Sequence, residues 1–411
     1  MIFGISPGGS SAPASGPLRG DVVVVGRGAN GAAAALGLAQ SGLRTVLVGP
    51  SPAPEPDTTW DARILALSPA SRTLLEHLRV WPALAQARVQ PVGAMRVFPD
   101  NRADAPELRF DAPDAGAQAL AYIVEARHLG AALEGGLGFA GVRVIDARVA
   151  QASVHPDRVE LGLHDGTHVH ARLLVAADGA GSPLRGLLGI AATERPYAQH
   201  AVVANFETAL PHEGCAWQWF GEHGILALLP LPGNRCSMVW SAAPALADEL
   251  MALPAAALAQ RVAETAGSVL GALAPLGSPA RFPLRLVRTG SLIAPRTVLL
   301  GDAAHAVHPL AGQGLNLGFG DVAELLAVLA RREPFRDLGD HLLLRRYERA
   351  RKGPVLAMSW ATDGLQRLFD PSPDATLPPL LQPLRVLREA GWRAVAGSPS
   401  LRRRLVRHAM S

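Results

Sequence analysis

The sequence predicts an α/β fold built on a parallel sheet, with a mixed-sheet domain interleaved in it and helices at the C-terminus. Four short apolar runs begin at Asp21, Arg44, Leu173 and Thr297, and each ends at a glycine or an aspartate. Continuous apolar runs of this length are typical of strands that are covered on both faces, as in parallel α/β sheets. Ligands bind at the carboxyl ends of such strands, so these distant segments are expected to meet at one extended ligand.

The first run leads into a glycine-rich turn and an alanine-rich helix. Gly26, Gly28 and Gly31 match the pattern G-x-G-x-x-G, and the stretch GAAAALGLAQSG predicts a helix that ends at Gly42. The first glycine suits a tight turn, the second lets the backbone approach a pyrophosphate, and the third permits close helix packing. The helix N-terminus would present free N–H groups to phosphates. This strand–helix–strand unit predicts a Rossmann-like dinucleotide-binding domain.

The strand that begins at Arg44 has an unusual end. In dinucleotide-binding domains an acidic residue there holds the ribose hydroxyls, and in this chain Gly49 occupies that place. Losing a hydrogen bond to a charged group costs on the order of 1.5–3 kcal/mol. Either other contacts compensate for the missing acid, or the cofactor is held loosely.

The remaining segments complete the predicted organisation. Residues 142–179 form a β-meander with turns at HPD and DGT, while AVVANFET, ILALLPL and CSMVWSAAP are strand-like. The domains expected are a flexible tail over 1–20, a first dinucleotide-binding part with the meander over 21–196, a substrate-binding β-sheet domain over 197–286, a second dinucleotide-binding part over 287–341, and a helical region over 342–411.

Composition sets the broad class. With 49% hydrophobic and 18% charged residues the chain is ordinary for a globular protein. No apolar run reaches the ~18 residues of a membrane span, and the N-terminus lacks the basic start and apolar stretch of a secretory signal. We therefore expect a cytoplasmic protein, in which Cys215 and Cys236 are free thiols.

Nearly all of the basic residues are arginine. Lys352 is the only lysine, and the chain ends in SLRRRLVRHAMS. A general preference for arginine explains this most simply; the alternative is a basic helix face that contacts the inner membrane or an acidic partner in a biosynthetic complex. No aromatic residues alternate with these arginines, so nucleic-acid binding is not expected.

The segment GDAAHAVHPLAGQGLNLGFG, which begins at Gly301, carries two histidines, His305 and His308. Two histidines three residues apart rarely bind a metal without a further clustered ligand. No such ligand accompanies them, so no metal site is predicted.

Together these motifs resemble the flavin-dependent hydroxylases of ubiquinone biosynthesis, a branch of the class A aromatic hydroxylases with the p-hydroxybenzoate hydroxylase fold. The resemblance runs from about Asp21 to about Arg388. It rests on four segments in the expected order: VVVVGRGANG, DARILALSPASRTLLEHLRVWPAL, ARLLVAADGAGSPLRGLLGI and GDAAHAVHPLAGQGLNLG.

The resemblance implies FAD as the cofactor and assigns residues to it. The three glycines would contact the pyrophosphate, and Arg63 would lie near the flavin and phosphates. Asp178 would lie near both FAD and the path by which the nicotinamide reductant approaches. Asp302 would bind the ribityl chain or its phosphates, and the run from Gly312 to Asn316 would lie under the isoalloxazine edge. The full set is Gly26, Gly28, Gly31, Arg63, Asp178, Gly179, Gly301, Asp302, Gly312, Gln313, Gly314, Leu315 and Asn316, with Leu228, Pro230 and Pro309 lining the substrate pocket.

The activity implied is hydroxylation of the aromatic ring of a polyprenylated phenol with O2 through a flavin C4a-hydroperoxide, so no side chain is assigned as catalytic. The chain has one dinucleotide motif, so NAD(P)H would bind transiently, or an external donor would supply electrons. One alternative is a hydroxylase of a soluble aromatic acid. Another is a flavin-fold accessory protein without tight FAD binding, suggested by Gly49 and by Ala126, where the family has an amide.

Overall fold

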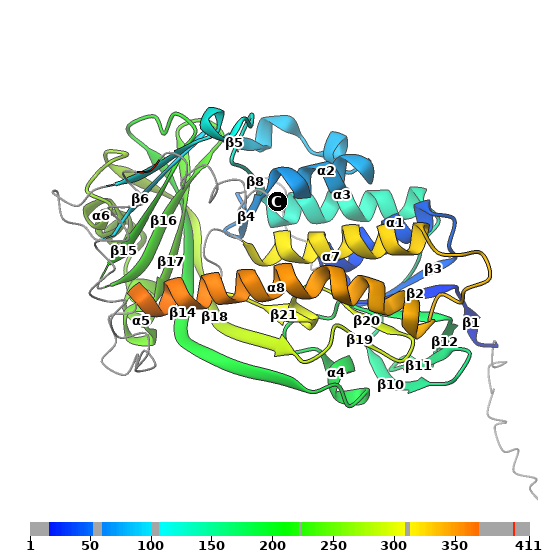
Figure 1. The fold of residues 1–411 in the computed structure, drawn as a ribbon. Coiled ribbons are helices and arrows are strands. Elements are labelled where there is room, and N and C mark those ends of the chain that lie inside the picture. The colour runs from blue at the N-terminus through cyan, green and yellow to red at the C-terminus, as the bar shows by residue number, and fades with distance from the viewer. Residues whose placement is uncertain are drawn as a thin grey trace, which may run out of the picture.

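The computed structural model describes residues 16–51, 60–99, 107–221, 223–308, 313–369 and 398. Figure 1 shows two parts side by side: helices stacked over a sheet, and a tall sheet at the other side with small helices on its outer face. Long strands run from one part into the other, so the two parts share one framework.

A six-stranded sheet forms the centre of the first part. Its strands are β2 (Val22–Val25), β3 (Thr45–Val48), β9 (Arg143–Ile145), β13 (Leu173–Ala176), β19 (Ile293–Ala294) and β20 (Thr297–Leu299). They lie in the order β19-β20-β13-β2-β3-β9, and all neighbours are parallel except β19 and β20. The four predicted apolar strands are β2, β3, β13 and β20, which confirms that prediction and brings their carboxyl ends to one edge.

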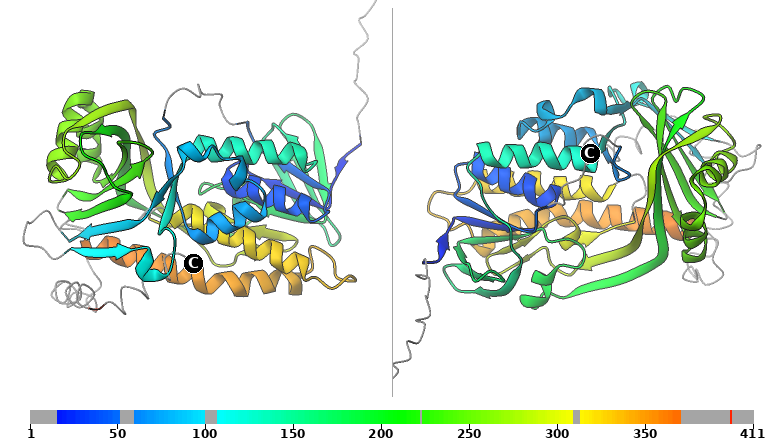
Figure 2. Two further views of the ribbon diagram at one scale, coloured as in Figure 1. Left: turned by 90° about the horizontal axis from the view of Figure 1, so that it is seen from above. Right: turned by 180° about the vertical axis from the view of Figure 1, so that it is seen from behind.

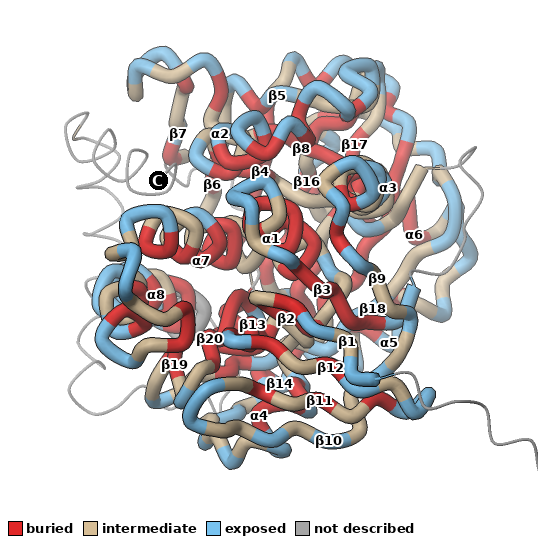
Figure 3. The backbone as a smooth tube through the Cα atoms, turned by 90° about the vertical axis from the view of Figure 1, so that its right-hand side faces the viewer, coloured by how far each residue is buried: buried red, intermediate tan, exposed pale blue. Residues whose placement is uncertain are grey.

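Helices cover one face of this sheet and the meander covers the other (Figure 3). The helices are α1 (Ala29–Gln40), α3 (Ala126–Phe139) and α7 (Gln313–Ala330). The meander comprises β10 (Val149–Val154), β11 (Val159–Leu163) and β12 (His168–Ala171), with β1 (Leu18–Arg19) added beside β12. The predicted N-terminal tail is therefore too long: its last residues form a strand because Leu18 pairs with Val169, while residues 1–15 lie outside the described part.

The second part is an eight-stranded sheet. Its strands are β6 (Ala94–Phe98), β7 (Leu108–Asp111), β14 (Ala192–Thr208), β15 (Cys215–Gly221), β16 (Gly224–Leu231), β17 (Arg235–Ala242), β18 (Leu273–Thr289) and β21 (His305–Ala306), in the order β21-β18-β14-β17-β16-β15-β6-β7. The sheet extends beyond the expected range 197–286. The hairpin of β6 and β7 adds to its edge beside β15, and β14 and β18 pass both boundaries.

Small helices cover the outer face of the eight-stranded sheet. α5 (Pro244–Ala252) and α6 (Ala255–Thr265) bury a second core that includes Met238 and Trp240. Cys215 and Cys236 belong to this core, and both are free thiols as predicted. The inner face is left to line a cavity.

The other elements pack around these two parts (Figure 2). They are a three-stranded sheet of β4 (Ile64–Leu67), β5 (Gln90–Val92) and β8 (Ala121–Glu125), the helices α2 (Pro69–His77), α4 (Pro183–Leu187) and α8 (His341–Phe369), and 3₁₀ turns at Trp81–Ala83, Gln86–Arg88, Pro113–Ala115 and Gly301–Ala303. α8 accounts for the start of the predicted C-terminal helical region; of the residues after Phe369, only Ser398 is described. Among the described helices, none has the length and apolar character needed to cross a membrane.

Candidate functional site

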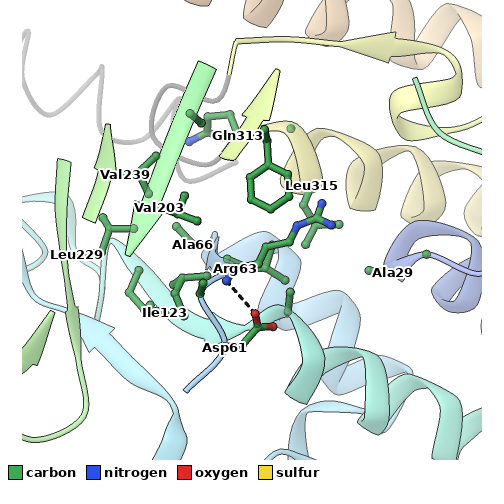
Figure 4. Close-up of a pocket in the computed structure, with 18 of the residues that line it drawn as sticks. Ala29, Asp61, Arg63, Ala66, Ile123, Val203, Leu229, Val239, Gln313 and Leu315 are labelled. Carbon is green, nitrogen blue, oxygen red and sulfur yellow. Dashed lines mark hydrogen bonds between the residues drawn. The ribbon is translucent and has the colours of Figure 1, made fainter. Parts of the chain in front are cut away.

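A cavity of about 1730 Å³ lies between the carboxyl ends of the parallel strands and the inner face of the eight-stranded sheet. Figure 4 shows Val203, Leu229 and Val239 on the sheet side and Ala29 of α1 on the opposite side. Cavities of about 300–1,000 Å³ hold one drug-sized ligand. This cavity therefore has room for an extended cofactor and a second molecule.

The glycine turn after β2 has two structural positions and one open position. Gly26 has φ +111°, and a Cβ there would lie 2.1 Å from the carbonyl oxygen of Ala177. A Cβ on Gly31 would lie 1.9 Å from the carbonyl oxygen of Gly26. By contrast, nothing lies within 4 Å of a Cβ on Gly28, which lines the cavity. The backbone at Gly28 is thus open to a ligand.

Two helices begin at the cavity. Gly28 is the N-cap of α1 and makes no side-chain cap, and α7 begins with Gln313, Gly314 and Leu315, which line the cavity. The first N–H groups of a helix have no partner within the helix, and the helix dipole adds positive potential there. Both ends suit an anionic group, as in sites that bind phosphate.

Asp302 lies in the 3₁₀ turn after β20 and its side chain opens into the cavity. Desolvation by the surrounding protein raises the pKa of this carboxyl above its ordinary value, although the charges of His305, Arg63 and Arg285 oppose that shift. Arg63 also lines the cavity, with its guanidinium 5.9 Å from the ring centre of Phe282. Arg285 was not predicted, because no motif marks it within β18.

Two residues that the resemblance assigns to the cofactor, Asp178 and Asn316, form hydrogen bonds with nearby protein groups instead of facing the cavity. The Asp178 carboxylate accepts hydrogen bonds from Ser182 Oγ (2.6 Å) and the Leu184 amide (3.0 Å), so it caps α4 while Gly179 lines the cavity. The Asn316 amide accepts hydrogen bonds from Ser68 and Ser71 and donates to Ala66, all within 2.8 Å. Neither side chain lines the cavity: Asp178 shapes the turn, and Asn316 fixes α7 against β4 and α2.

The predicted substrate residues on β16 are wrong by one position. Leu228 packs in the core under α5 and α6, and Pro230 is buried on the same face of the strand. Because side chains alternate along a strand, the intervening residues Ile225, Ala227 and Leu229 line the cavity instead. Pro309 and Gly312 lie outside the described residues.

The sheet side of the cavity is mainly apolar. Val203, Val239, Ala227 and Gln218 form one cross-strand row from β14 to β15. Gln218 and Ser241 are buried polar residues that line the cavity, so they are available to orient a ligand. The sequence analysis missed both; the alternation along β15, in which Trp217 and Trp219 pack under the helices, would have placed Gln218 on the inner face.

The two histidines of the Gly301 segment are structural. His305 Nε2 lies 2.7 Å from Asp321 Oδ2, and Asp321 also accepts hydrogen bonds from Arg351 Nε (2.7 Å) and the Gly301 amide (2.9 Å). His308 Nε2 lies 3.0 Å from Gln199 Oε1. Within the described part of the chain, no three His, Cys, Asp or Glu side chains are placed to hold a metal.

The open backbone at Gly28 and the two helix N-termini at the cavity suit a long anionic dinucleotide better than a compact anion. A family model described as FAD binding domain matches residues 19–359. Ubiquinone hydroxylase UbiL of Rhodospirillum rubrum is 34% identical over 413 residues, covering 98% of this chain and 93% of the relative. The 3-demethoxyubiquinol 3-hydroxylase of Escherichia coli is 34% identical over 396 residues, covering 95% of this chain and 98% of the relative.

Solved structures share the fold. Klebsiella pneumoniae HpxO, complexed with FAD and uric acid, has a TM-score of 0.73 at 19% identity and covers 96% of each chain. The p-nitrophenol 4-monooxygenase PnpA of Pseudomonas putida has a TM-score of 0.72 at 18% identity, covering 95% of this chain and 97% of its own.

Proposed function

This chain belongs to the FAD-dependent hydroxylases of ubiquinone biosynthesis, and on that premise we propose how its cavity serves the reaction. It is an FAD-dependent aromatic-ring monooxygenase. Its substrate is a polyprenylated phenol, with the ring held between the cofactor end of the cavity and the inner face of the eight-stranded sheet.

The cofactor end is assigned to residues of the first part. Gly28 and the N-terminus of α1 would hold the pyrophosphate, Asp302 and Arg63 would lie beside the ribityl chain and phosphates, and the N-terminus of α7 would face the flavin ring. When bound, FAD supplies the electron transfer and the oxygen chemistry, with NAD(P)H as a transient reductant. The protein binds, orients and excludes water.

One observation carries the substrate assignment: the cavity continues from the cofactor end onto a broad apolar sheet face. Val203, Ala227, Leu229 and Val239 offer aliphatic contact along that face, which suits a prenyl chain because burial of apolar surface is favourable. Gln218 and Ser241 supply the few polar groups that an aromatic ring with oxygen substituents needs for orientation.

A soluble aromatic acid is the second candidate, and Arg285 is the observation that favours it. A lining arginine can pair with a substrate carboxylate. However, Arg285 lies beside the turn at Gly181 and its charge acts on Asp302, which places it at the cofactor end. The polyprenylated phenol is therefore preferred.

The purified protein is expected to show a bound-flavin spectrum after FAD is added, to bleach with NADH or NADPH without oxygen, and to hydroxylate a polyprenylated phenol when oxygen returns. The product is identified by mass spectrometry. Turnover of a soluble aromatic acid alone would favour the second candidate. A protein that takes up no FAD would favour an accessory role.

Ala227→Leu is expected to raise KM for the prenylated phenol by about 10-fold or more. The larger side chain would enter the cavity from the cross-strand row, between Val239 and Gln218. Overpacking costs about 1–3 kcal/mol. Steady-state kinetics measures the effect, with FAD affinity as the internal control because the row lies away from the glycine turn. An unchanged KM would mean that the substrate does not lie against this face.

The basic C-terminal stretch SLRRRLVRHAMS, which lies outside the described residues, is proposed to contact the membrane peripherally. Each arginine near an anionic surface contributes about 1 kcal/mol. Deleting residues 398–411 is therefore expected to lower co-sedimentation with anionic liposomes by at least about 10-fold. Neutral liposomes are the control. Equal binding of the full and truncated chains would contradict the proposal.

A further inference from the structure

The position after β3 is closed to any side chain. A Cβ on Gly49 would lie 2.8 Å from the backbone nitrogen of Arg27 and 3.0 Å from its Cβ. The acid that usually ends this strand therefore cannot be present without moving the glycine turn. Gly49 is thus a consequence of the close approach of the glycine turn to the end of β3, and the ribose needs a partner from elsewhere.

Arg27 binds a carboxylate from a different element. Its Nε and Nη2 donate to the two oxygens of Glu134 on α3 at 2.7 and 2.8 Å, and its Nη1 donates to Ser51 Oγ at 2.7 Å. The exposed fractions of the Arg27 and Glu134 side chains are 16% and 24%. Such a bidentate pair fixes the direction of both side chains.

Glu134 keeps capacity for a ligand. An ionised carboxylate offers about four lone-pair sites, and the bonds from Arg27 use one on each oxygen. Arg27 and Glu134 line the cavity beside Gly28, as do Gly130 and Ala131 on the same helix. These small residues leave room for a ligand to approach α3.

We propose that Glu134 binds the ribose hydroxyls of the adenosine half of FAD, in place of an acid at the end of β3. Arg27 is a positioning residue that orients this carboxylate. Each of its three guanidinium nitrogens donates a hydrogen bond to Glu134 or Ser51, which fixes the direction of the Arg27 side chain. The inference rests on the proposed binding of FAD.

The test measures the affinity of the apoprotein for FAD by quenching of flavin fluorescence. Glu134→Gln and Arg27→Gln are each expected to weaken FAD binding by about 10-fold, because the charged acceptor is removed or loses its orientation. Neither change should alter FMN binding, since FMN lacks adenosine. Glu76→Gln is the matched control: it breaks another arginine–glutamate pair, Arg72–Glu76 on α2, which does not line the cavity.

A second comparison keeps the test independent of folding. In the wild type, an FAD analogue with 2′-deoxyadenosine is expected to bind about 10-fold more weakly than FAD. In Glu134→Gln, the analogue and FAD are expected to bind with equal affinity. Equal loss in both proteins would overturn the assignment of Glu134, as would unchanged FAD affinity in the variants. Failure of the wild type to bind FAD would instead contradict the proposed function.

Gly49→Glu tests whether the end of β3 can accept an acidic residue. Because its side chain would meet the backbone of Arg27, this variant is expected to bind FAD more weakly than the wild type. Tighter binding would show that the end of β3 is open to an acid and would overturn the inference.

Discussion

Gly31→Ala is expected to lower the free energy of unfolding by about 3 kcal/mol or more, which is at or above the upper end of ordinary overpacking costs. The new Cβ would lie 1.9 Å from the Gly26 carbonyl oxygen, and that carbonyl belongs to the turn packed against β13. Neither backbone segment can retreat without breaking the junction of β2, α1 and β13. Urea denaturation of the apoprotein measures the loss.

Gly28→Ala, in the same turn, separates folding from ligand binding. Its Cβ meets nothing within 4 Å and its φ is −75°, so the unfolding free energy should change by less than about 1 kcal/mol, a typical cap effect. The methyl group would enter the space assigned to the pyrophosphate, and FAD affinity should fall. If both variants lost equal stability, the division between structural and open glycines would be wrong.

Asp321→Asn is expected to cost about 3–5 kcal/mol, the usual effect of removing one member of a buried ion pair. Asp321 is fully buried and holds His305, Arg351 and the Gly301 amide. The change leaves buried positive charge without its partner. It also loosens the segment that carries Asp302, so FAD binding should weaken with stability. Chemical denaturation at neutral pH measures the free energy of unfolding, and flavin titration measures the affinity for FAD.

The pH dependence provides a second readout for Asp321. Burial alone would raise the pKa of this carboxyl, but His305 and Arg351 outweigh burial and hold the pKa below its ordinary value. The contribution of the Asp321 carboxylate to the free energy of unfolding is therefore fully present above pH about 3.8. It is lost as the pH falls through the lower pKa of the folded state. Asp321→Asn should remove this acid sensitivity.

Glu333→Gln is the matched control for Asp321. Arg346 lowers the pKa of Glu333 to about 2, with Arg336 contributing, but these side chains lie partly exposed at the surface. Ion pairs at the surface contribute little to stability, so the free energy of unfolding at neutral pH should scarcely change. Equal losses at Glu333 and Asp321 would contradict the importance assigned to burial.

Local patterns predicted most of the first part of the fold. Four apolar runs became neighbouring parallel strands, and Gly26 and Gly31 occupy positions where any side chain would collide with backbone. Such features depend on nearby residues, so a sequence displays them directly. The motifs of the glycine turn and the Gly301 segment likewise located the cofactor end of the cavity.

Features that depend on partners distant in sequence were not predicted. The face of β16 that meets the cavity depends on which side α5 and α6 cover, and Leu228 was therefore placed one residue out of phase. Arg27 and Glu134 are 107 residues apart; Arg27 occupies a variable position of the glycine motif, and Glu134 belongs to no recognisable pattern. Asp178 and Asn316 lie in the expected segments, but capping and packing decide where their side chains point.

The paired strands β14 and β18 are each 17 residues long and extend through both parts of the molecule. The register of this ladder shifts between Pro196 and His200 and between Val203 and Asn205, and pairing resumes after each shift. A chimera that takes the expected substrate domain, residues 197–286, from a relative in order to exchange substrate specificity would therefore cut this ladder at both junctions. Joints placed after Thr208 and before Leu273 would preserve the ladder and transfer β15, β16 and β17 with their two covering helices.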